Sequence, residues 1–440
     1  MSVFAPAMWA GPSLVLVVLV TAWWFELKLS ESAVAQMVIA AFGWTSVCCV
    51  GLLTQFVGHS PGAPLELAEW FSVGHYATVW NEALDPLALL LSLLASGLIL
   101  LIAVFSRSYL HSETGYLRFY LLTTLFGLGV LLVALSGSLA QLLFGWELVG
   151  VTSALLIAFF SHRVTPARSA LRAFLSYRVG DIGLLSAVAL LHHVAGTTDF
   201  HETGQHAWLG VHNPGTPGVT TALLLLVLMA CAGKSALAPF CGWLPRAMEG
   251  PTPSSAIFYG ALSINLGPFL LLRCWPLLES SPIGRVAVFV VGLATVVHGT
   301  LVGRVQSDAK SALAYGSMTQ VGLVVMEIAL GWYALAVVHM IGHACLRTLE
   351  LLRAPSLLHD YSHLEKSLGE VLPRMGAHYE RMLTPGARSW LYRQALERGA
   401  FEALALWAVQ AWVSVASRLH RADVGLEALL CGAPDEMEKR

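Results

Sequence analysis

Charged residues are scarce in this sequence. Asp, Glu, Lys and Arg make up only 12% of its 440 residues, whereas about 25% is usual in a soluble domain. Hydrophobic residues reach 56%, and the mean hydropathy is +0.69. So few charges cannot supply a water-facing surface for a chain of this length, and most of the surface is expected to face lipid. The formal net charge of −2 also excludes a generally basic nucleic-acid binder.

The sequence also lacks the cysteine patterns of metal or disulfide scaffolds. None of its seven cysteines forms a CxxC pair, and most lie inside apolar runs, which is typical of small buried hydrophobic residues. Five histidines fall between residues 192 and 212, but their spacings match no standard ligand pattern. We therefore predict no metal site and no cofactor in this chain.

Long apolar runs are abundant. A helix needs about 20 apolar residues to cross a bilayer. Runs of that size occur eleven times, at residues 3–24, 33–57, 83–105, 119–137, 139–160, 173–194, 219–239, 254–278, 284–302, 311–330 and 332–353. Residues 401–419 are apolar again but contain three polar side chains, so they form either a twelfth span or an interfacial helix. The predicted fold class is an all-α polytopic membrane protein with 11–12 transmembrane helices.

The loops between these runs differ in positive charge. One set of alternate loops holds nine basic residues, namely Lys28, Arg107, Arg118, Arg163, Arg168, Arg172, Arg246, Arg304 and Lys310. The opposite set holds Arg285 and, at a helix end, Arg273. Because basic loops stay on the cytoplasmic side, we expect a multi-pass protein of a bacterial inner membrane with its N-terminus outside. Residues 355–400 are then a cytoplasmic amphipathic segment.

Some charges lie where lipid should exclude them. A charge in the middle of a span costs at least ~2.5–3.5 kcal/mol on insertion scales, so each needs a reason. Four ionisable residues occupy such positions: Glu147, Asp181, Lys234 and Arg347. Arg178 precedes Asp181 by one turn, so the two can pair, either as a structural ion pair or as part of a functional site. His339 and His343 share one helix face, where they carry protons or only cap hydrogen bonds.

Lys234 is followed by a helix breaker. Pro239 removes a backbone hydrogen bond about one turn later and predicts a broken helix there. Bringing Glu147 next to Lys234 would stabilise both charged forms, and separating them would release or capture a proton. The sequence therefore predicts a proton path through these residues.

Three stretches resemble a known family. They are FGWELVG at 144–150, KSA at 234–236 with WLPRAMEGPTP at 243–253, and QSDAK at 306–310 with AYGSMTQVG at 314–322. Together they resemble the proton-conducting, antiporter-like membrane subunits, such as the L subunit of respiratory complex I and MrpA of the multisubunit sodium/proton antiporters. The resemblance covers roughly residues 75–353.

The resemblance implies two inverted helix repeats, each with a broken helix and a proton half-channel. The residues that match the family's path are Glu147, Lys234, Asp181, Arg178, His339, His343, Arg347, Tyr259 and Lys310, with Pro239 and Pro245 in the broken helix. The expected division is 1–116 for the N-terminal helices, 117–278 for the first repeat, 279–354 for a shortened second repeat, 355–400 for the cytoplasmic segment and 401–440 for a terminal hydrophobic helix and polar tail.

Several positions depart from the family pattern. Tyr259 stands where complex I subunits usually have a histidine, and Arg347 stands where they have a lysine. An arginine does not release its proton under ordinary conditions. Thr319, not an acid, is the counterpart of Glu147 in the second repeat. We therefore expect a partner to complete the second half of the path.

These departures, with residues 351–361 and 391–399, are most similar to the DabB family, the membrane subunits of DAB inorganic-carbon accumulation complexes. That resemblance implies an ion-conducting subunit, expected to carry protons, that drives a cytoplasmic zinc-binding DabA-like partner resembling β-carbonic anhydrase. Zinc is then expected in the partner, and this chain contacts lipid and no nucleic acid. The alternatives are a proton-pumping L-like subunit of an NADH–quinone oxidoreductase, a sodium/proton antiporter subunit, or a simple membrane anchor.

Overall fold

The structure is a computed structural model of the 440-residue chain. It describes residues 4–55, 65–73, 76–200, 217–306, 308–368 and 383–397, together with Gln410, Ser414, Ser417, Arg418 and Arg421. Most of residues 401–440, including the expected terminal helix and tail, lie outside the described residues. His201, His206 and His212 also lie outside them.

Eleven helical segments in the described part of the chain are long and apolar enough to cross a membrane, as predicted. Ten are single helices: α1 (Phe4–Trp24), α2 (Glu31–Gln55), α3 (Pro86–Tyr109), α4 (Tyr116–Leu135), α5 (Leu139–Ile157), α6 (Val164–Ala195), α7 (Pro217–Lys234), α11 (Pro282–Gly303), α12 (Ala309–Leu330) and α13 (Tyr333–Leu368). The eighth span is irregular and consists of α8 (Thr252–Ser254), the π-helix η4 (Ser255–Ala261), η5 (Ser263–Asn265) and α9 (Leu266–Arg273).

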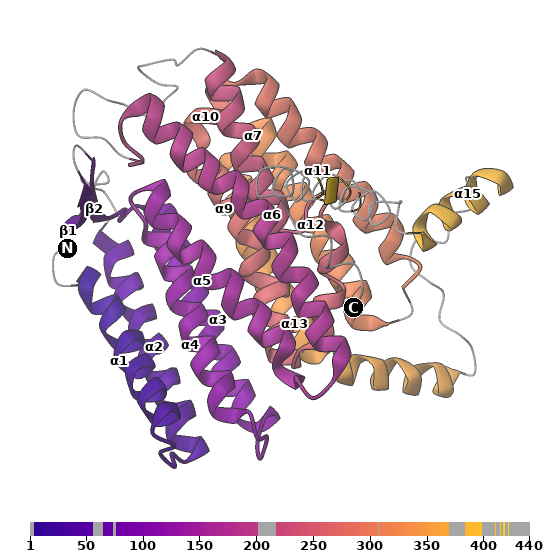
Figure 1. Cartoon of the computed structure of the whole chain (residues 1–440). Helices are drawn as coiled ribbons and strands as arrows, with labels where there is room; N and C mark the ends of the chain where they lie inside the picture. Colours follow the sequence, from indigo (N-terminus) through magenta and orange to yellow (C-terminus); the bar gives the residue numbers. More distant parts are fainter. Residues whose placement is uncertain are drawn as a thin grey trace, which may run out of the picture.

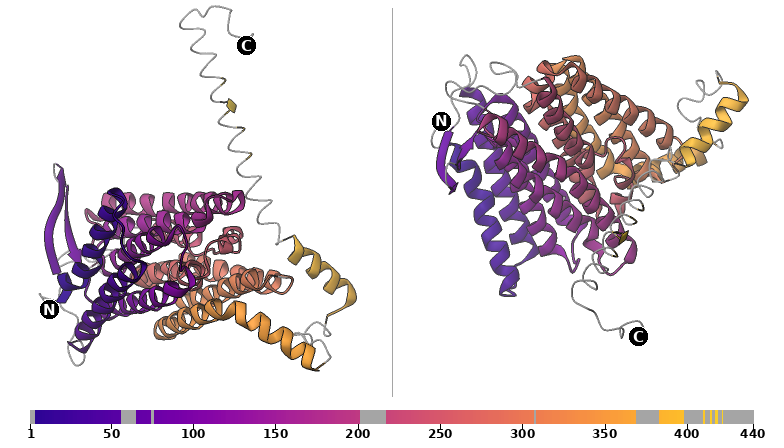
Figure 2. Two further views of the ribbon diagram at one scale, coloured as in Figure 1. Left: turned by 90° about the horizontal axis from the view of Figure 1, so that it is seen from below. Right: turned by 45° about the horizontal axis from the view of Figure 1, so that its top comes forward.

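Shorter helices connect or extend these spans. They are η1 (Ala158–Phe160), η2 (Cys241–Trp243), η3 (Arg246–Glu249), α10 (Trp275–Ser280) and α15 (Pro385–Leu396). Figure 1 shows the spans side by side, with α1–α4 at one end of the molecule and α11–α13 at the other. The end of α13 and α15 extend away from this bundle (Figure 2).

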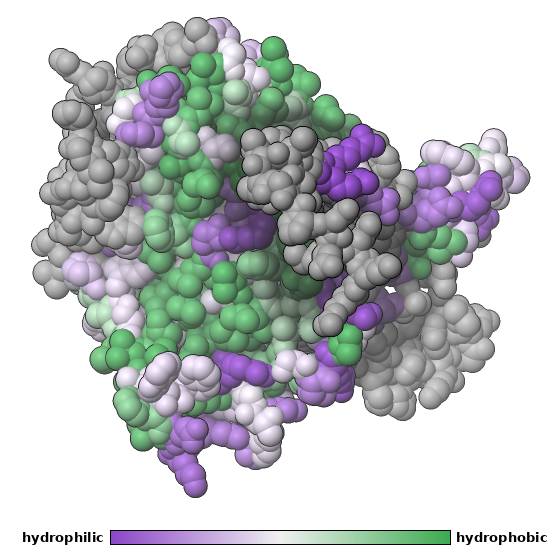
Figure 3. Space-filling view, in the orientation of Figure 1, coloured by the Kyte–Doolittle hydropathy of each residue, from purple (hydrophilic) through white to green (hydrophobic). Residues whose placement is uncertain are grey.

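The broken eighth span lies at the centre of the bundle. The most apolar stretch of this span is 100% buried inside the protein, whereas the most apolar stretches of α1 and α11 are 28% and 33% buried. Figure 3 shows the outer helices as a hydrophobic band that contains one small hydrophilic patch over α6. Irregular backbone is tolerated at membrane depth where protein covers it, so this burial explains how a span with a π-helix can persist.

Small residues bring neighbouring helices close together. A Cβ atom on Gly145 of α5 would lie 2.7 Å from the carbonyl oxygen of Gly129 on α4. Gly292 of α11 and Gly322 of α12 face each other, and a Cβ on either one would lie 2.9 Å from the other's carbonyl oxygen. Helices in lipid associate through such close backbone packing. Gly145 thus marks a close contact between α4 and α5.

The sequence prediction missed a β-hairpin. Strands β1 (Leu65–Val73) and β2 (Tyr76–Glu82) pair in antiparallel fashion between α2 and α3. Both strands are rich in aromatic and β-branched residues and are separated by two residues, which is a hairpin signal. A bridge between Glu82 and Ser136 joins β2 to the α4–α5 turn. The third span therefore begins at Pro86 rather than at residue 83.

Glu82, the last residue of the hairpin, is completely buried. Its Oε1 accepts a 2.6 Å hydrogen bond from the Trp9 indole N–H, while its Oε2 has no hydrogen-bond partner among the described residues. Burial raises the pKa of Glu82 above its usual 4.5, and the Trp9 bond only partly opposes this shift. Folding therefore shifts Glu82 toward its neutral form relative to the unfolded chain.

This burial makes stability depend on pH. Because the folded-state pKa is raised, the stability that Glu82 contributes is fully present below pH 4.5 and is lost as the pH rises through the raised value. We expect Glu82→Gln, which is neutral at every pH and still accepts the Trp9 bond, to increase the Tm at pH 8 and to have little effect near pH 4. Melting curves across this range test it, with the exposed Glu113→Gln as control. An E82Q effect that does not vary with pH would contradict the assignment.

Candidate functional site

The site forms around a break in the seventh span. Helix α7 ends at Lys234, and the chain then passes through η2 and η3 before α8 begins at Thr252. Pro239 and Pro245 both lie in this connection, so the predicted break is confirmed. The Trp243 indole N–H returns to the end of α7 and donates to the carbonyl oxygen of Gly233 at 3.1 Å.

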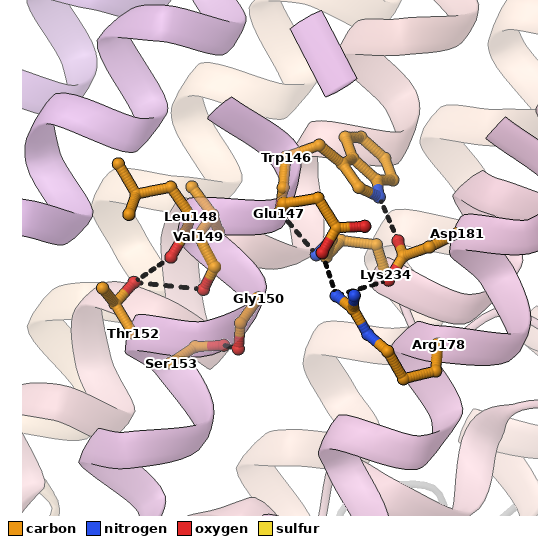
Figure 4. Close-up of polar contacts among 10 residues, drawn as sticks. All are labelled: Trp146, Glu147, Leu148, Val149, Gly150, Thr152, Ser153, Arg178, Asp181 and Lys234. Atoms are coloured by element: carbon orange, nitrogen blue, oxygen red, sulfur yellow. Dashed lines mark hydrogen bonds and ion pairs between the residues drawn. The ribbon is translucent and has the colours of Figure 1, made fainter. Parts of the chain in front are cut away.

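Lys234 is the buried cation of the site. Only 1% of its surface is exposed. Its Nζ donates a 2.8 Å hydrogen bond to the carbonyl oxygen of Trp146 and lies 5.2 Å and 4.7 Å from the ring centroids of Trp146 and Tyr177. A Cβ atom on Gly150 would lie 2.7 Å from this nitrogen, so the glycine makes room for the ammonium group. The lysine is therefore held by a carbonyl dipole and aromatic faces (Figure 4).

Arg178 joins two carboxylates on neighbouring helices. Its Nη2 pairs with Glu147 on α5 and with Asp181 on its own helix α6, the latter at 2.7 Å. The other oxygen of Asp181 accepts a 2.8 Å hydrogen bond from the Trp146 indole N–H. The predicted Arg178–Asp181 pair is confirmed.

The expected direct contact between Glu147 and Lys234 is not formed. Helix α5 directs the Glu147 side chain toward Arg178, while the backbone carbonyl of the preceding residue, Trp146, faces Lys234 (Figure 4). The side chains of Glu147 and Arg178 are 33% and 35% exposed, and that of Asp181 is 8% exposed. The four ionised side chains have a formal sum of zero, so loss of the Lys234 proton would leave one net negative charge.

A second polar group joins α12 and α13. His339 Nδ1 lies 2.8 Å from Glu327 Oε1, and His339 Nε2 lies 2.9 Å from Gln320 Oε1. The sequence prediction included His339 but not Glu327 or Gln320. A charge inside a span was the signal that could have identified Glu327. It stands only three residues before the predicted end of that span.

The remaining predicted residues lie apart from Lys234 or next to other partners. His343 is 6% exposed, and its ring nitrogens have no hydrogen-bond partner among the described residues. Arg347 pairs with Glu350 at 2.7 Å and lies against Gly316. The hydroxyl of Tyr259 donates to the Ser153 carbonyl at 3.1 Å.

Lys310 occupies the first turn of α12. Seventeen residues of helix, about 25 Å, separate it from Glu327. Lys310 is therefore at the opposite end of α12 from the His339 group.

Comparison with known proteins identifies the family. Residues 136–369, more than half of the chain, match the family described as NADH:quinone oxidoreductase/Mrp antiporter, transmembrane part. The chain belongs to this family. Residues 70–120 also match the N-terminal region of complex I chain 5. The chain is therefore an antiporter-like, multi-pass membrane subunit.

Curated relatives extend this result. The chain is 33% identical to NAD(P)H-quinone oxidoreductase chain 5 of Synechocystis sp. over 74% of its own length and 48% of the relative's. It is 34% identical to the chloroplastic subunit 5 of Brachypodium distachyon over 68% of its length and 40% of the relative's. The chain thus spans about half or less of the length of these relatives.

Two solved structures share the fold. A chain of the Mrp complex from Dietzia sp. has a TM-score of 0.66 and 26% identity, with 86% of this chain and 40% of that chain covered. A chain of the membrane-bound sulfane sulfur reductase, an archaeal respiratory complex, has a TM-score of 0.70 and 18% identity, with 90% of this chain and 82% of that chain covered. The antiporter-like helical fold is therefore confirmed.

The partner prediction is corrected by these matches. The relatives are named as parts of NAD(P)H-quinone oxidoreductases and of an Mrp complex. The expected zinc-binding DabA-like partner is therefore wrong, coupling to CO2 hydration is not supported, and the DabB branch is not shown. The alternative of a proton-pumping, L-like subunit fits better. That this chain itself holds no cofactor stays a prediction.

The space beside Lys234 provides a direct test of this site. We expect Gly150→Ala to displace the ammonium group and to lower ion conduction several-fold, because the new Cβ would meet the flexible end of Lys234 rather than backbone. The rate of ion uptake into liposomes that contain the reconstituted protein measures the effect. Gly342→Ala is the control, because no atom lies within 4 Å of the added Cβ there. Normal conduction by the Gly150→Ala variant would show that conduction does not depend on where the Lys234 ammonium lies.

Proposed function

We propose that this chain conducts protons across the membrane as an antiporter-like subunit of a multisubunit complex. The observation that carries the proposal is Lys234, a fully buried lysine at a helix break, which bonds to a carbonyl while Arg178 holds both nearby carboxylates. A buried ammonium without a carboxylate partner is costly. A function that needs the lysine to gain and lose a proton explains why it is there.

The geometry supports a switch through Arg178. When Arg178 holds Glu147, Lys234 has no ion-pair partner among the described residues, and an unpaired buried charge is costly. If Glu147 turns from Arg178 toward Lys234, the ammonium gains a carboxylate neighbour and retains its proton. Return of Glu147 to Arg178 then favours release. The Trp146 carbonyl that binds Lys234 is bonded directly to the backbone nitrogen of Glu147. Glu147 can therefore change partners from Arg178 to Lys234 by a side-chain movement, without a shift of α5.

The exposed members of the ion pair support a membrane partner. Glu147 and Arg178 are 33% and 35% exposed near the middle of α5 and α6, where contact of charge with lipid is unfavourable. We infer that another membrane subunit covers them, in line with the complexes to which the relatives belong. The bias of basic loops supports a bacterial inner membrane with the N-terminus outside.

Substitution of Lys234 tests proton conduction. In liposomes that contain the complex purified through this chain, a potential should drive proton uptake that a pH-sensitive dye detects. We expect Lys234→Met to abolish this uptake, because methionine has similar length and no titratable group. Lys234→Arg should fail as well, since arginine retains its proton.

The exposed Lys28→Met serves as the control. Unchanged uptake by both Lys234 variants would exclude the proposed role. Uptake that requires a sodium gradient would favour the sodium/proton antiporter alternative, which the 26% identity to an Mrp chain supports.

Purification tests the proposed partner. We expect the tagged chain to retain other multi-pass subunits in a mild detergent, and Glu147→Leu combined with Arg178→Leu to weaken this retention at least in part. Mass spectrometry of the eluate identifies the bound subunits. A chain that elutes alone, with the wild-type ion pair present, would contradict the interface.

A further inference from the structure

We propose that Glu327 and His339 share one proton and form the protonation site of the second half of the subunit, at the end of α12 nearest the predicted outer surface. This inference rests on the proposed function and adds a residue to it. The added residue is Glu327, which the sequence prediction omitted. Glu327 gives the second half an acid, whereas Thr319, the counterpart of Glu147 there, is not acidic.

The turn between the helices brings the two residues together. Gly331 ends α12 with a φ of 89°, a left-handed conformation that favours glycine. The backbone N–H of Trp332 then donates to the carbonyl of Glu327 at 2.9 Å, and α13 begins at Tyr333. This short turn fixes the register of the two helices, so Glu327 and His339 meet at 2.8 Å across the hairpin.

The hydrogen bonds define how the proton is shared. Gln320 Oε1 accepts a bond from His339 Nε2, which leaves Nδ1 facing Glu327 Oε1. In one state Nδ1–H donates to a carboxylate from an imidazolium ring. In the other, the N–H bond has broken and an O–H bond has formed, so that a neutral acid donates to a neutral ring. Charge balances in both states, and the proton moves along one existing hydrogen bond.

Glu327 retains a free acceptor for the next transfer. Its Oε2 is buried and has no hydrogen-bond partner among the described residues. Arg285, a cation from α11 near this end, donates through Nε to the carbonyl of Ala329. The Glu327 side chain is 16% exposed and that of His339 is 24% exposed, so both are partly accessible. A group that must exchange protons with one membrane surface needs this combination of burial and access.

The position of the pair completes a row of polar groups. His339, His343 and Arg347 are four residues apart, so they follow one face of α13 at steps of about 6 Å. Glu327 lies about 4.5 Å from the end of α12. The chain has crossed the membrane ten times by this point, and an even number of spans puts this end on the side where the chain starts. Glu327 is thus at the outer end of the row, while Arg347 is deeper.

Conduction by matched variants tests the inference. In the reconstituted complex, we expect Glu327→Gln to abolish proton uptake, because glutamine preserves the size and a hydrogen bond to His339 but holds no exchangeable charge. Glu327→Asp should retain part of the activity. Glu279→Gln removes an exposed carboxylate from α10 at the same end and should conduct normally. Melting temperatures and complex assembly should stay unchanged.

A spectroscopic measurement provides a second readout. A pH jump should produce an infrared carboxylic-acid band that is absent in the Glu327→Gln complex and present in the Glu279→Gln complex. Normal uptake by Glu327→Gln, or an unchanged infrared band, would overturn the inference. If Lys234→Met still blocks uptake in that case, the proposed function survives without Glu327. If the wild-type complex shows no uptake at all, the proposed function fails first.

Discussion

The hydrogen bond from Lys234 to the carbonyl oxygen of Trp146 is the interaction on which the rest of the site depends. It joins the last residue of α7 to the middle of α5, and it stands where an ion pair would otherwise neutralise the lysine. Gly150 leaves space for the ammonium, and Trp146 also fixes Asp181 through its indole N–H. One tryptophan therefore contacts the cation through its backbone and an anion through its side chain, so any shift of α5 moves both.

The large features of the fold were predictable because they follow from hydrophobicity. Apolar run lengths predicted eleven spans, and Pro239 after Lys234 predicted the break in the seventh span. The hairpin was not predicted, because its signal is aromatic and β-branched residues in two short segments and not a long apolar run. The Glu147–Arg178 pair was not predicted, because side-chain partners on different helices depend on helix rotation, which spacing along one chain does not determine.

The sequence motifs determine the family of this chain but not its branch within the family. The motifs around Glu147 and Lys234 predicted an antiporter-like subunit, and the comparisons confirm it. Tyr259, Arg347 and the missing second acid favoured a carbon-accumulation branch. Such departures describe how this path differs from others, and they contain no information about which protein docks on it. For the acid that is missing at Thr319, the structure shows a carboxylate on another turn of α12, where Glu327 lies next to His339.

The burial of the broken eighth span has a mechanical consequence. Its π-helix and short turns lie in a span whose most apolar stretch is 100% buried inside the protein. The irregular segment can therefore exchange hydrogen-bond partners without opening any backbone group to hydrocarbon. A change of conformation in this span during turnover would therefore bring no unpaired backbone group into contact with lipid.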